Sequence, residues 1–337
     1  MTHAHPPELI GPLLRQVSRS FYLTLRVLPK EVRRQISLAY LLARATDTIA
    51  DTEVVPRARR LELLRQMQAG EIKAVAELVE HQALPAERRL LERLDECWAM
   101  LQSFSEGDQK LIGELWKTII EGQIFDLERF PGPLTALASE EELDRYTYLV
   151  AGCVGEFWTR MCAAHVKELA DWKDGAMEEK GVRFGKGLQL VNILRDVPRD
   201  LRIGRCYLPV REPQRLLDAR HFSEICSLYH QWLDVAVEHL DAGWQYTMAI
   251  PTRLWRLRLA CTWPIWIGLE TIALLRDANP LDADRRVMVP QRVVNRMLLR
   301  TVLTCCCPRS LDYRYRQLRA KAARQRHSGS EKLDRIE

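Results

Sequence analysis

The chain has 337 residues, of which 47% are hydrophobic, so it is long enough to bury a substantial core in one large domain or two ordinary ones. Its 50 Lys and Arg residues exceed its 45 Asp and Glu residues by only 5, which is too weak an excess to argue for a nucleic-acid partner. The 9 cysteines form no Cys-x-x-Cys pair, which argues against a disulfide scaffold or a zinc site and favours a reducing cytoplasm.

Residues 1–8 carry no basic region followed by an apolar stretch, so the N-terminus does not read as a signal peptide. We expect residues 1–15 to be a short extension that precedes one domain of residues 16–305. Apolar residues recur there at spacings of three and four, glycine and proline are sparse, and strand-like alternation is hard to find. This periodicity predicts an all-α fold of helices packed on helices.

The helix predicted from about Glu31 carries the first informative motif, Arg44-Ala-Thr-Asp47-Thr-Ile-Ala-Asp51. Four residues advance an α-helix by about 6 Å and nearly one turn, so Asp47 and Asp51 project from the same face. Two carboxylates placed in this way repel each other unless a cation lies between them. One pair alone is a weak signal, because on the order of one Asp-x-x-x-Asp is expected by chance in a chain this acidic.

The helical segment Tyr146–Gly155 contains Gly152 and Gly155. Glycine inside a helix costs stability, and it usually indicates that something approaches the backbone closely. That neighbour is either a tightly packed helix or a bound ligand.

A second pair, Asp196 and Asp200, occurs in the segment Gln189–Asp200, and no third pair is present in the sequence. Gln189, Asn192 and Asp196 stand at i, i+3 and i+7 and therefore share one helix face with amide and carboxylate oxygens. Pro198 disfavours the continuation of a helix, so we expect the helix to end or bend before Asp200.

The most apolar stretch, Leu259–Leu275, is interrupted by Pro264 and Glu270 and falls short of the roughly 18 uninterrupted residues that a transmembrane helix needs. We predict a buried core helix and no transmembrane helix. The last residues, 306–337, form a basic tail in which Arg314–Arg326 is poor in large apolar groups. Its two interpretations are a solvated, disordered end and an electrostatic contact with anionic lipid, which would make the chain peripheral at the inner face of a membrane.

Both aspartate pairs have arginines beside them, Arg44 in the first motif and Arg195 and Arg199 in the second. Mg²⁺ prefers oxygen ligands and typically bridges carboxylates to substrate phosphates, and guanidinium groups match phosphate geometry. The alternative is that these arginines only neutralise the aspartates on a solvated face. The predicted magnesium ligands are Asp47, Asp51, Asn192, Asp196 and Asp200.

From Ser18 to about Arg300, the chain resembles the squalene/phytoene synthase family. The similar segments are Ser18-Arg19-Ser20-Phe21, which resembles a substrate lid; Tyr40–Asp51 and Gly187–Pro209, which resemble the two aspartate-rich helices; and Glu121–Leu127 and Tyr146–Gly155, which resemble cavity-lining helices. The resemblance implies a single-domain isoprenoid-synthase bundle around a central apolar cavity. It also implies that Mg²⁺ helps to join two farnesyl diphosphates head to head through presqualene diphosphate.

The resemblance further implies which residues act. Catalytic roles fall to Tyr148, Tyr40, Phe21, Arg44 and Arg195. Substrate binding falls to Ser18, Arg19, Ser20, Phe21, Arg44, Gln123, Val150, Gly152, Gln189, Asn192, Arg195 and Tyr207.

Within the family, the sequences of Arg44–Asp51 and of Val287–Arg300 resemble those of squalene synthases more than those of phytoene synthases. This implies squalene formation with NADPH as hydride donor. The chain departs from eukaryotic members at Thr52, where they have an acid, and at Leu149, where they have a tyrosine. Tyr148 stands one place earlier. No Gly-x-Gly-x-x-Gly follows a strand, so the NADPH prediction comes from the resemblance alone.

Three other functions stay open. The first is the same condensation without reduction, as in phytoene or dehydrosqualene synthases. The second is a terpene cyclase or a chain-elongating prenyltransferase, but these usually show denser acidic motifs. The third is a non-enzymatic scaffold or assembly factor, which would be expected to lose the metal-binding acids that this chain keeps.

Overall fold

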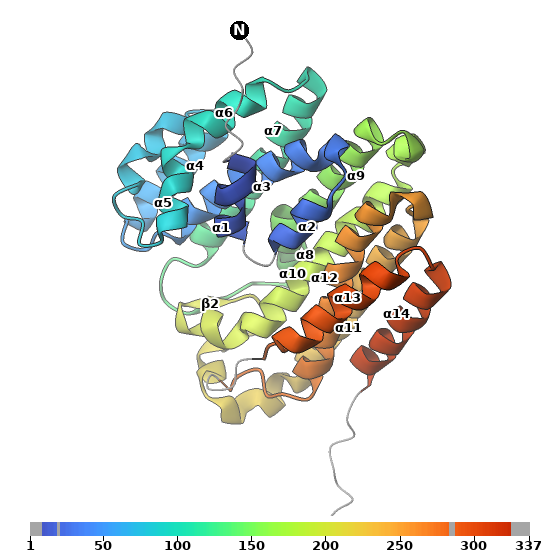
Figure 1. The fold of residues 1–337 in the computed structure, drawn as a ribbon. Coiled ribbons are helices and arrows are strands. Elements are labelled where there is room, and N and C mark those ends of the chain that lie inside the picture. Colours follow the sequence, from blue (N-terminus) through green and yellow to red (C-terminus); the bar gives the residue numbers. More distant parts are fainter. Residues whose placement is uncertain (1–8, 19–20, 283–286, 325–337) are drawn as a thin grey trace, which may run out of the picture.

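The computed structural model describes residues 9–18, 21–282 and 287–324, and it confirms the all-α fold (Figure 1). The α-helices are α1 (Leu14–Ser18), α2 (Tyr22–Val27), α3 (Lys30–Asp51), α4 (Arg57–Gln68), α5 (Pro85–Glu92), α6 (Leu94–Gln102), α7 (Glu106–Arg129), α8 (Glu140–Thr147), α9 (Cys153–His165), α10 (Ala176–Arg202), α11 (Phe222–Ala249), α12 (Trp255–Arg276), α13 (Gln291–Thr304) and α14 (Pro308–Ala323).

Short helical turns and one strand pair complete the described chain. The π-helical turns are η1 (Leu9–Leu13) and η4 (Tyr148–Gly152), and the 3₁₀ turns are η3 (Ile72–Leu78), η5 (Lys167–Asp174), η6 (Pro213–Leu217), η7 (Ala219–His221) and η8 (Thr252–Leu254). The strands β1 (Thr135–Ala136) and β2 (Arg205–Cys206) pair in parallel, with Thr135 opposite Arg205.

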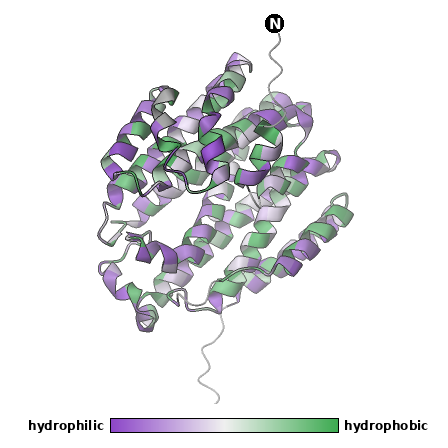
Figure 2. Cartoon of the chain, turned by 60° about the vertical axis from the view of Figure 1, so that its left-hand side comes forward, coloured by the Kyte–Doolittle hydropathy of each residue, from purple (hydrophilic) through white to green (hydrophobic). Residues whose placement is uncertain are grey.

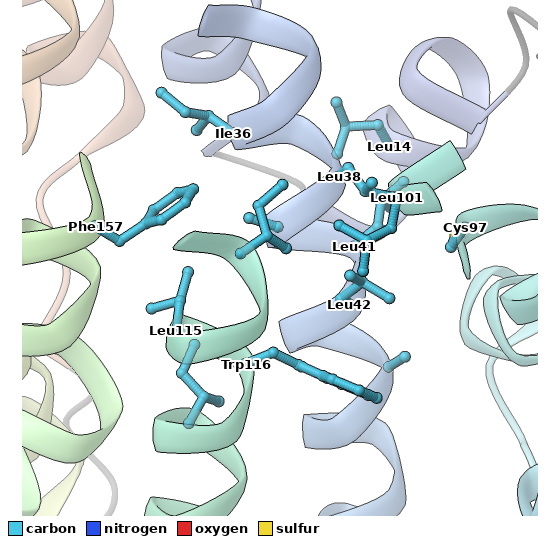
Figure 3. Packing of buried hydrophobic residues seen from close by; sticks show 14 of the residues in the cluster. Leu14, Ile36, Leu38, Leu41, Leu42, Cys97, Leu101, Leu115, Trp116 and Phe157 are labelled. Atoms are coloured by element: carbon cyan, nitrogen blue, oxygen red, sulfur yellow. The ribbon is translucent and has the colours of Figure 1, made fainter. Parts of the chain in front are cut away.

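Two hydrophobic cores organise the helices. The first joins α3, α4, α6, α7 and α9, and the second joins α10, α11, α12 and α14; Phe184 of α10 packs against both. Figure 3 shows Leu41 and Leu42 of α3 in the first core with Leu115 and Trp116 of α7. Most helices carry both hydrophobic and hydrophilic turns (Figure 2), as helices with one buried face do.

The C-terminal end of α3, which carries the first aspartate pair, is fixed by side chains from other segments. Arg60 of α4 donates to the Ala50 carbonyl, and Gln82 donates to the hydroxyl of Thr52, which in turn donates to the Thr48 carbonyl. These bonds satisfy backbone groups that the end of a helix leaves without intrahelical partners.

The sequence predicts that the helix ends or bends before Asp200; it does not end there, because α10 continues through Pro198 to Arg202. A proline in a helix leaves the carbonyl four residues earlier without its N–H partner. That carbonyl belongs to Leu194, and the hydroxyl of Tyr229 on α11 donates to it over 3.0 Å. The hydrogen bond from a neighbouring helix replaces the missing one, so Asp196 and Asp200 stay on one helix.

The tail also differs from the expectation, because Pro308–Ala323 forms α14. Leu311, Tyr315, Leu318 and Ala322 are buried on one side of it, and the Tyr315 ring stacks on Trp244 of α11 with centroids 4.5 Å apart. Their spacing of four, three and four residues is helical, although the many basic residues between them favoured a solvated tail. Residues 325–337 lie outside the described residues.

The predicted core helix within Leu259–Leu275 is confirmed as part of α12, with Pro264 inside it. In the described part of the chain, the helical stretch Thr252–Arg276 is long and apolar enough to cross a membrane. However, 83% of its most apolar window is buried inside the protein, as in the core helix of a globular protein.

The backbones of α9 and α10 approach each other closely at glycines. A Cβ atom on Gly155 would lie 1.9 Å from the Gly181 carbonyl oxygen, and one on Gly185 would lie 2.1 Å from the Ala151 carbonyl oxygen. The close neighbour of Gly155 predicted from the sequence is therefore a helix. Only glycine permits this approach, because any side chain would overlap backbone atoms that cannot move aside.

We expect Gly155→Ala to destabilise the protein by about 2–3 kcal/mol, because the new methyl group overlaps the backbone of α10. Gly113→Ala in α7 is the matched control; no atom lies within 4 Å of its Cβ, so it should be neutral or stabilising by up to about 1 kcal/mol. Urea denaturation followed by circular dichroism measures both. Equal midpoints for Gly155→Ala and the wild type would contradict the close approach.

Candidate active site

A cavity of about 420 Å³ lies between the two halves of the bundle, within the size range of small-molecule sites. Its walls come from Phe21, Thr24, Tyr40, Ala43 and Asp47; Ile119 and Gln123; Val150, Ala151, Val154, Gly155 and Trp158; Gly181, Phe184, Gly185, Leu188, Gln189 and Asn192; and Tyr246, Ala260, Cys261 and Pro264. Most of these side chains are apolar. This confirms that the fold encloses an apolar hollow.

The polar lining residues lie toward one end of the cavity. Along α3, Asp47 follows the aromatic Tyr40, and along α10, Gln189 and Asn192 follow the small and apolar residues that begin at Gly181. The polar groups therefore stand in the C-terminal halves of both helices. A ligand with a charged head and a hydrocarbon chain fits this separation of polar and apolar walls.

Asp47 is the carboxylate that lines the cavity. Gln123 of α7 donates to its Oδ1 atom over 2.6 Å, whereas the Oε1 atom of Gln123 is buried without a hydrogen-bond partner. Burial raises the pKa of Asp47 to about 6, and the negative charge of Asp51 adds to this effect. Because 45% of the Asp47 side chain remains accessible, a cation or ligand in the cavity can reach it.

Asp126, Tyr146 and Tyr207 form a buried network around Arg205, whose charge acts on Asp51. The Arg205 Nη1 atom lies 2.9 Å from the Oδ2 atom of Asp126, and the Tyr207 hydroxyl donates to the Oδ1 atom of Asp126 over 2.5 Å. The Tyr146 ring stacks on Tyr207 with centroids 4.8 Å apart. Burial raises the pKa of Asp51, and the charge of Arg205 acts against that rise.

The second aspartate pair reaches the same network. Burial raises the pKa of Asp200 to about 7, the charge of Asp196 raises it further, and Arg199 and Arg205 lower it. Arg195 holds Asp196 through two hydrogen bonds of 2.9 and 2.6 Å. Asp47 of the first motif and Gln189 and Asn192 of the second line the same cavity, so both motifs reach it, and the charge of Arg205 acts on both Asp51 and Asp200.

A glycine places Arg205 in this position. Gly204 has φ +85, in the left-handed region that favours glycine, and a Cβ atom on it would lie 2.4 Å from the Gly132 carbonyl oxygen. The next residue, Arg205, pairs with Thr135 in the short sheet. The turn therefore links the end of α10 to the segment that follows α7.

The cavity contains some of the predicted site residues and not others. The lining residues among them are Phe21, Tyr40, Asp47, Gln123, Val150, Gln189 and Asn192. Those outside the lining are Ser18, Arg44, Asp51, Tyr148, Gly152, Arg195, Asp196, Asp200 and Tyr207. Arg19 and Ser20 lie outside the described residues.

Tyr148 points away from the cavity. Its hydroxyl donates to Oε2 of Glu156 over 2.9 Å, and burial together with that carboxylate raises the pKa of Tyr148 to about 12. Tyr148 is the first residue of the π-helical turn η4, in which one extra residue per turn changes the direction of the side chains that come after it. Val150 and Ala151 take the cavity-facing positions, and the tyrosines in the cavity wall are Tyr40 and Tyr246.

Sequence reasoning missed Asp126, Arg205 and Tyr246 as site residues. Asp126 stands three residues after Gln123 on the same face of α7, a spacing that could have indicated it. Arg205 and Tyr246 carry no such local signal, because the turn at Gly204 and the packing of α11 bring them to the site.

The polar end fits a divalent cation that is shared with a ligand. Among the described residues, no three His, Cys, Asp or Glu side chains come close enough to hold a metal alone. The Nη1 atom of Arg44 lies 3.9 Å from the Oδ2 atom of Asp47, and the Oε1 atom of Gln123 beside Asp47 has no hydrogen-bond partner, so oxygen ligands remain available at this end. Mg²⁺ typically takes one or two carboxylates and completes its ligands with water and phosphate oxygens.

A protein-family model described as squalene/phytoene synthase matches residues 14–293. The bifunctional lycopene cyclase/phytoene synthase of Blakeslea trispora is 32% identical over 210 residues, 58% of this chain and 31% of that protein. The 15-cis-phytoene synthase of Synechocystis sp. is 27% identical over 304 residues, which are 84% of this chain and 80% of that protein. The squalene synthase of Bos taurus is 29% identical over 196 residues, which are 58% of this chain and 45% of that protein. The chain thus spans less than half the length of the first and third of these relatives.

Solved structures show the same fold. A TcSQS complex with the ligand BPH1237 has a TM-score of 0.75 and 19% identity, with 94% of this chain and 92% of that chain covered. A dehydrosqualene synthase in complex with a ligand has a TM-score of 0.58 and 20% identity, with 87% and 93% covered. These likenesses confirm a single-domain all-α isoprenoid-synthase fold.

The raised pKa values predict how stability depends on pH without divalent cations. A carboxyl whose pKa is raised by folding favours the folded state when protonated, so its contribution is complete below the ordinary value of 3.8. For Asp47 and Asp200 it is lost as the pH rises through about 6 and about 7. Thermal unfolding in a chelating buffer should therefore show a falling melting temperature across this window.

Asp200→Asn should flatten that decline and should raise the melting temperature above pH 7. The control is Asp218→Asn at the surface, where Arg220 lowers the pKa of the carboxyl to about 2, so that it does not titrate in the window. A pH profile for Asp200→Asn that follows the wild type would show that the Asp200 pKa is not raised.

Proposed function

The chain belongs to the squalene/phytoene synthase family, whose members join prenyl diphosphates head to head, and we propose that it converts two farnesyl diphosphates to squalene. The family resemblance seen in the sequence is thereby confirmed. The observation that carries the proposal is that both aspartate motifs contribute polar side chains, Asp47 from the first and Gln189 and Asn192 from the second, to the wall of one mostly apolar cavity.

The polar end is where the diphosphate groups would bind. Arg44, Arg195, Arg199 and Arg205 stand among the acids and offer guanidinium groups to phosphate oxygens. The residues that would hold Mg²⁺ are Asp47, Asp51, Asn192, Asp196 and Asp200. When bound, Mg²⁺ supplies positive charge that stabilises the departing diphosphate.

The apolar walls would hold the two prenyl chains and exclude water from the allylic cation that forms when a diphosphate leaves. Phe21 and Tyr40 stack with ring centroids 5.5 Å apart and both line the cavity. Aromatic faces stabilise a neighbouring cation. We assign this role to Phe21 and Tyr40, and we do not assign it to Tyr148, whose hydroxyl is held by Glu156.

The reduction step is proposed from sequence similarity. In the described chain, the strands β1 and β2 have two residues each, so the residues present do not build a Rossmann site for NADPH. NADPH use is proposed on the similarity of Arg44–Asp51 and Val287–Arg300 to squalene synthases. Condensation without reduction is the second candidate, and its support is the similarity to phytoene synthases.

We expect purified protein with farnesyl diphosphate and Mg²⁺ to produce squalene when NADPH is present, and presqualene diphosphate or an unreduced hydrocarbon when it is omitted. Mass spectrometry of the extracted lipid, with geranylgeranyl diphosphate as a parallel substrate, distinguishes the candidates. A product that does not change when NADPH is omitted would contradict the squalene assignment. The absence of any condensed product would favour a scaffold.

Asp47→Asn and Asp196→Asn should each lower condensation by about 10²-fold or more, because each removes a carboxylate that would face the cation and diphosphate. The melting temperature of Asp47→Asn should be unchanged or higher, since the substitution removes a charge that burial and Asp51 disfavour. Asp218→Asn serves as the control for both readouts. Full activity in either site variant, or unfolding of Asp47→Asn, would assign the acids a structural role.

A further inference from the structure

Helix α13 is attached to the protein along one side only. Its buried residues are Met297 and Thr301, and the indole nitrogen of Trp263 on α12 donates to the Thr301 hydroxyl over 2.7 Å. The helix lies at the outside of the bundle beside α14 (Figure 1). Its other sides are exposed to solvent in the monomer.

The exposed side of α13 is apolar near its C-terminal end. Leu299, Val302 and Leu303 are 63%, 49% and 76% exposed, and their spacing places them on one face. We call these three residues the α13 outer face. Met288, just before the helix, is 58% exposed as well. An apolar helix face left in water, unlike a single exposed leucine, marks a contact surface.

The same segment is positively charged. From Val287 to Leu311 the sequence contains Arg292, Arg296, Arg300 and Arg309 but no Asp or Glu. The arginines of α13 are exposed, and none of them forms an ion pair with another described residue. An amphipathic helix with an apolar face and unpaired arginines is typical of helices that lie in the interface of an anionic bilayer.

The sequence suggested a lipid contact in the region of helix α14, but many side chains of this helix already contact the rest of the protein. Leu311, Tyr315, Leu318 and Ala322 are buried in the second core, Tyr313 is its one large apolar side chain that is exposed among the described residues, and several of its cations are already paired with acids. These pairs are Arg314 and Lys321 with Glu270, Arg316 with Asp312, and Arg319 with Asp241. Both the apolar contact and the free positive charge are therefore greater on α13.

We propose that α13 docks the protein on an anionic lipid bilayer, with the α13 outer face in the interface and Arg292, Arg296 and Arg300 against the headgroups. The position of the helix suits this role. Trp263, which holds α13, precedes Pro264 in α12, and Pro264 lines the cavity. The docked surface thus lies behind one wall of the cavity, where an enzyme with prenyl diphosphate substrates and a hydrocarbon product, as proposed above, benefits from lipid nearby.

Flotation of the full chain with vesicles tests the proposal without substrate, so its outcome is independent of the proposed activity. We expect binding to vesicles that contain phosphatidylglycerol and much weaker binding to pure phosphatidylcholine. The double variant Leu299→Ser/Leu303→Ser should bind at least about tenfold more weakly. The triple variant Arg292→Gln/Arg296→Gln/Arg300→Gln should also bind about tenfold more weakly and should lose the salt dependence.

Two matched variants complete the experiment. Leu217→Ser removes a leucine that is 57% exposed in η6, and Arg316→Gln/Arg324→Gln removes two cations from the α14 region; neither should change binding. Unchanged melting temperatures show that the exposed substitutions leave the fold intact. The proposal is overturned if the wild type does not float, if the α14 variant alone loses binding, or if the α13 outer face mediates self-association in light scattering instead.

Discussion

The other features of the site depend on the crowding of carboxylates at the polar end of the cavity. Removal from water raises the pKa of Asp47, Asp51, Asp126 and Asp200, because the ionised form loses hydration, and the like charges of neighbouring acids raise it further. Arg205 supplies part of that charge, since it pairs with Asp126 and lowers the pKa of Asp51 and Asp200. Desolvation outweighs the effect of Arg205, so the pKa values stay above the ordinary value. An anionic substrate that arrives with Mg²⁺ is the kind of ligand that such a site is suited to bind.

The acids keep their positions because side chains from other helices complete the hydrogen bonds that α3 and α10 lack. Arg60 satisfies the Ala50 carbonyl next to Asp51, and the Tyr229 hydroxyl satisfies the Leu194 carbonyl that Pro198 leaves open. Each of these bonds is local in its effect, but each partner is distant in the sequence. The close approach of α9 and α10 at Gly155 likewise depends on a partner from another helix. It brings two walls of the cavity together without side chains between them.

The parts of the structure that sequence analysis could predict are those fixed within one helix. The spacing of Asp47 and Asp51 follows from helical geometry alone, and the burial of α12 follows from its composition. Features that depend on a partner elsewhere in the chain could not be predicted in this way. The continuation of α10 needs Tyr229, the orientation of Tyr148 needs Glu156, and the position of Arg205 needs the turn at Gly204. In α14 the helical spacing was present, but the high charge concealed it.

Charged side chains gather in two places, the acids at the polar end of the cavity and the arginines along α13. Their different exposure to water suits them to different kinds of ligand. At the polar end of the cavity, several acids are crowded and partly removed from water, and this desolvation raises the pKa of Asp47 and Asp200. Along α13, the uncompensated arginines are exposed and fully hydrated, so they cost little and their charge reaches outward over about one Debye length, roughly 8 Å at physiological salt. The first arrangement favours a ligand that enters and neutralises the site. The arginines of α13 favour a large anionic surface that all of them can contact at once. The apolar residues of the α13 outer face further favour a surface with a hydrocarbon interior.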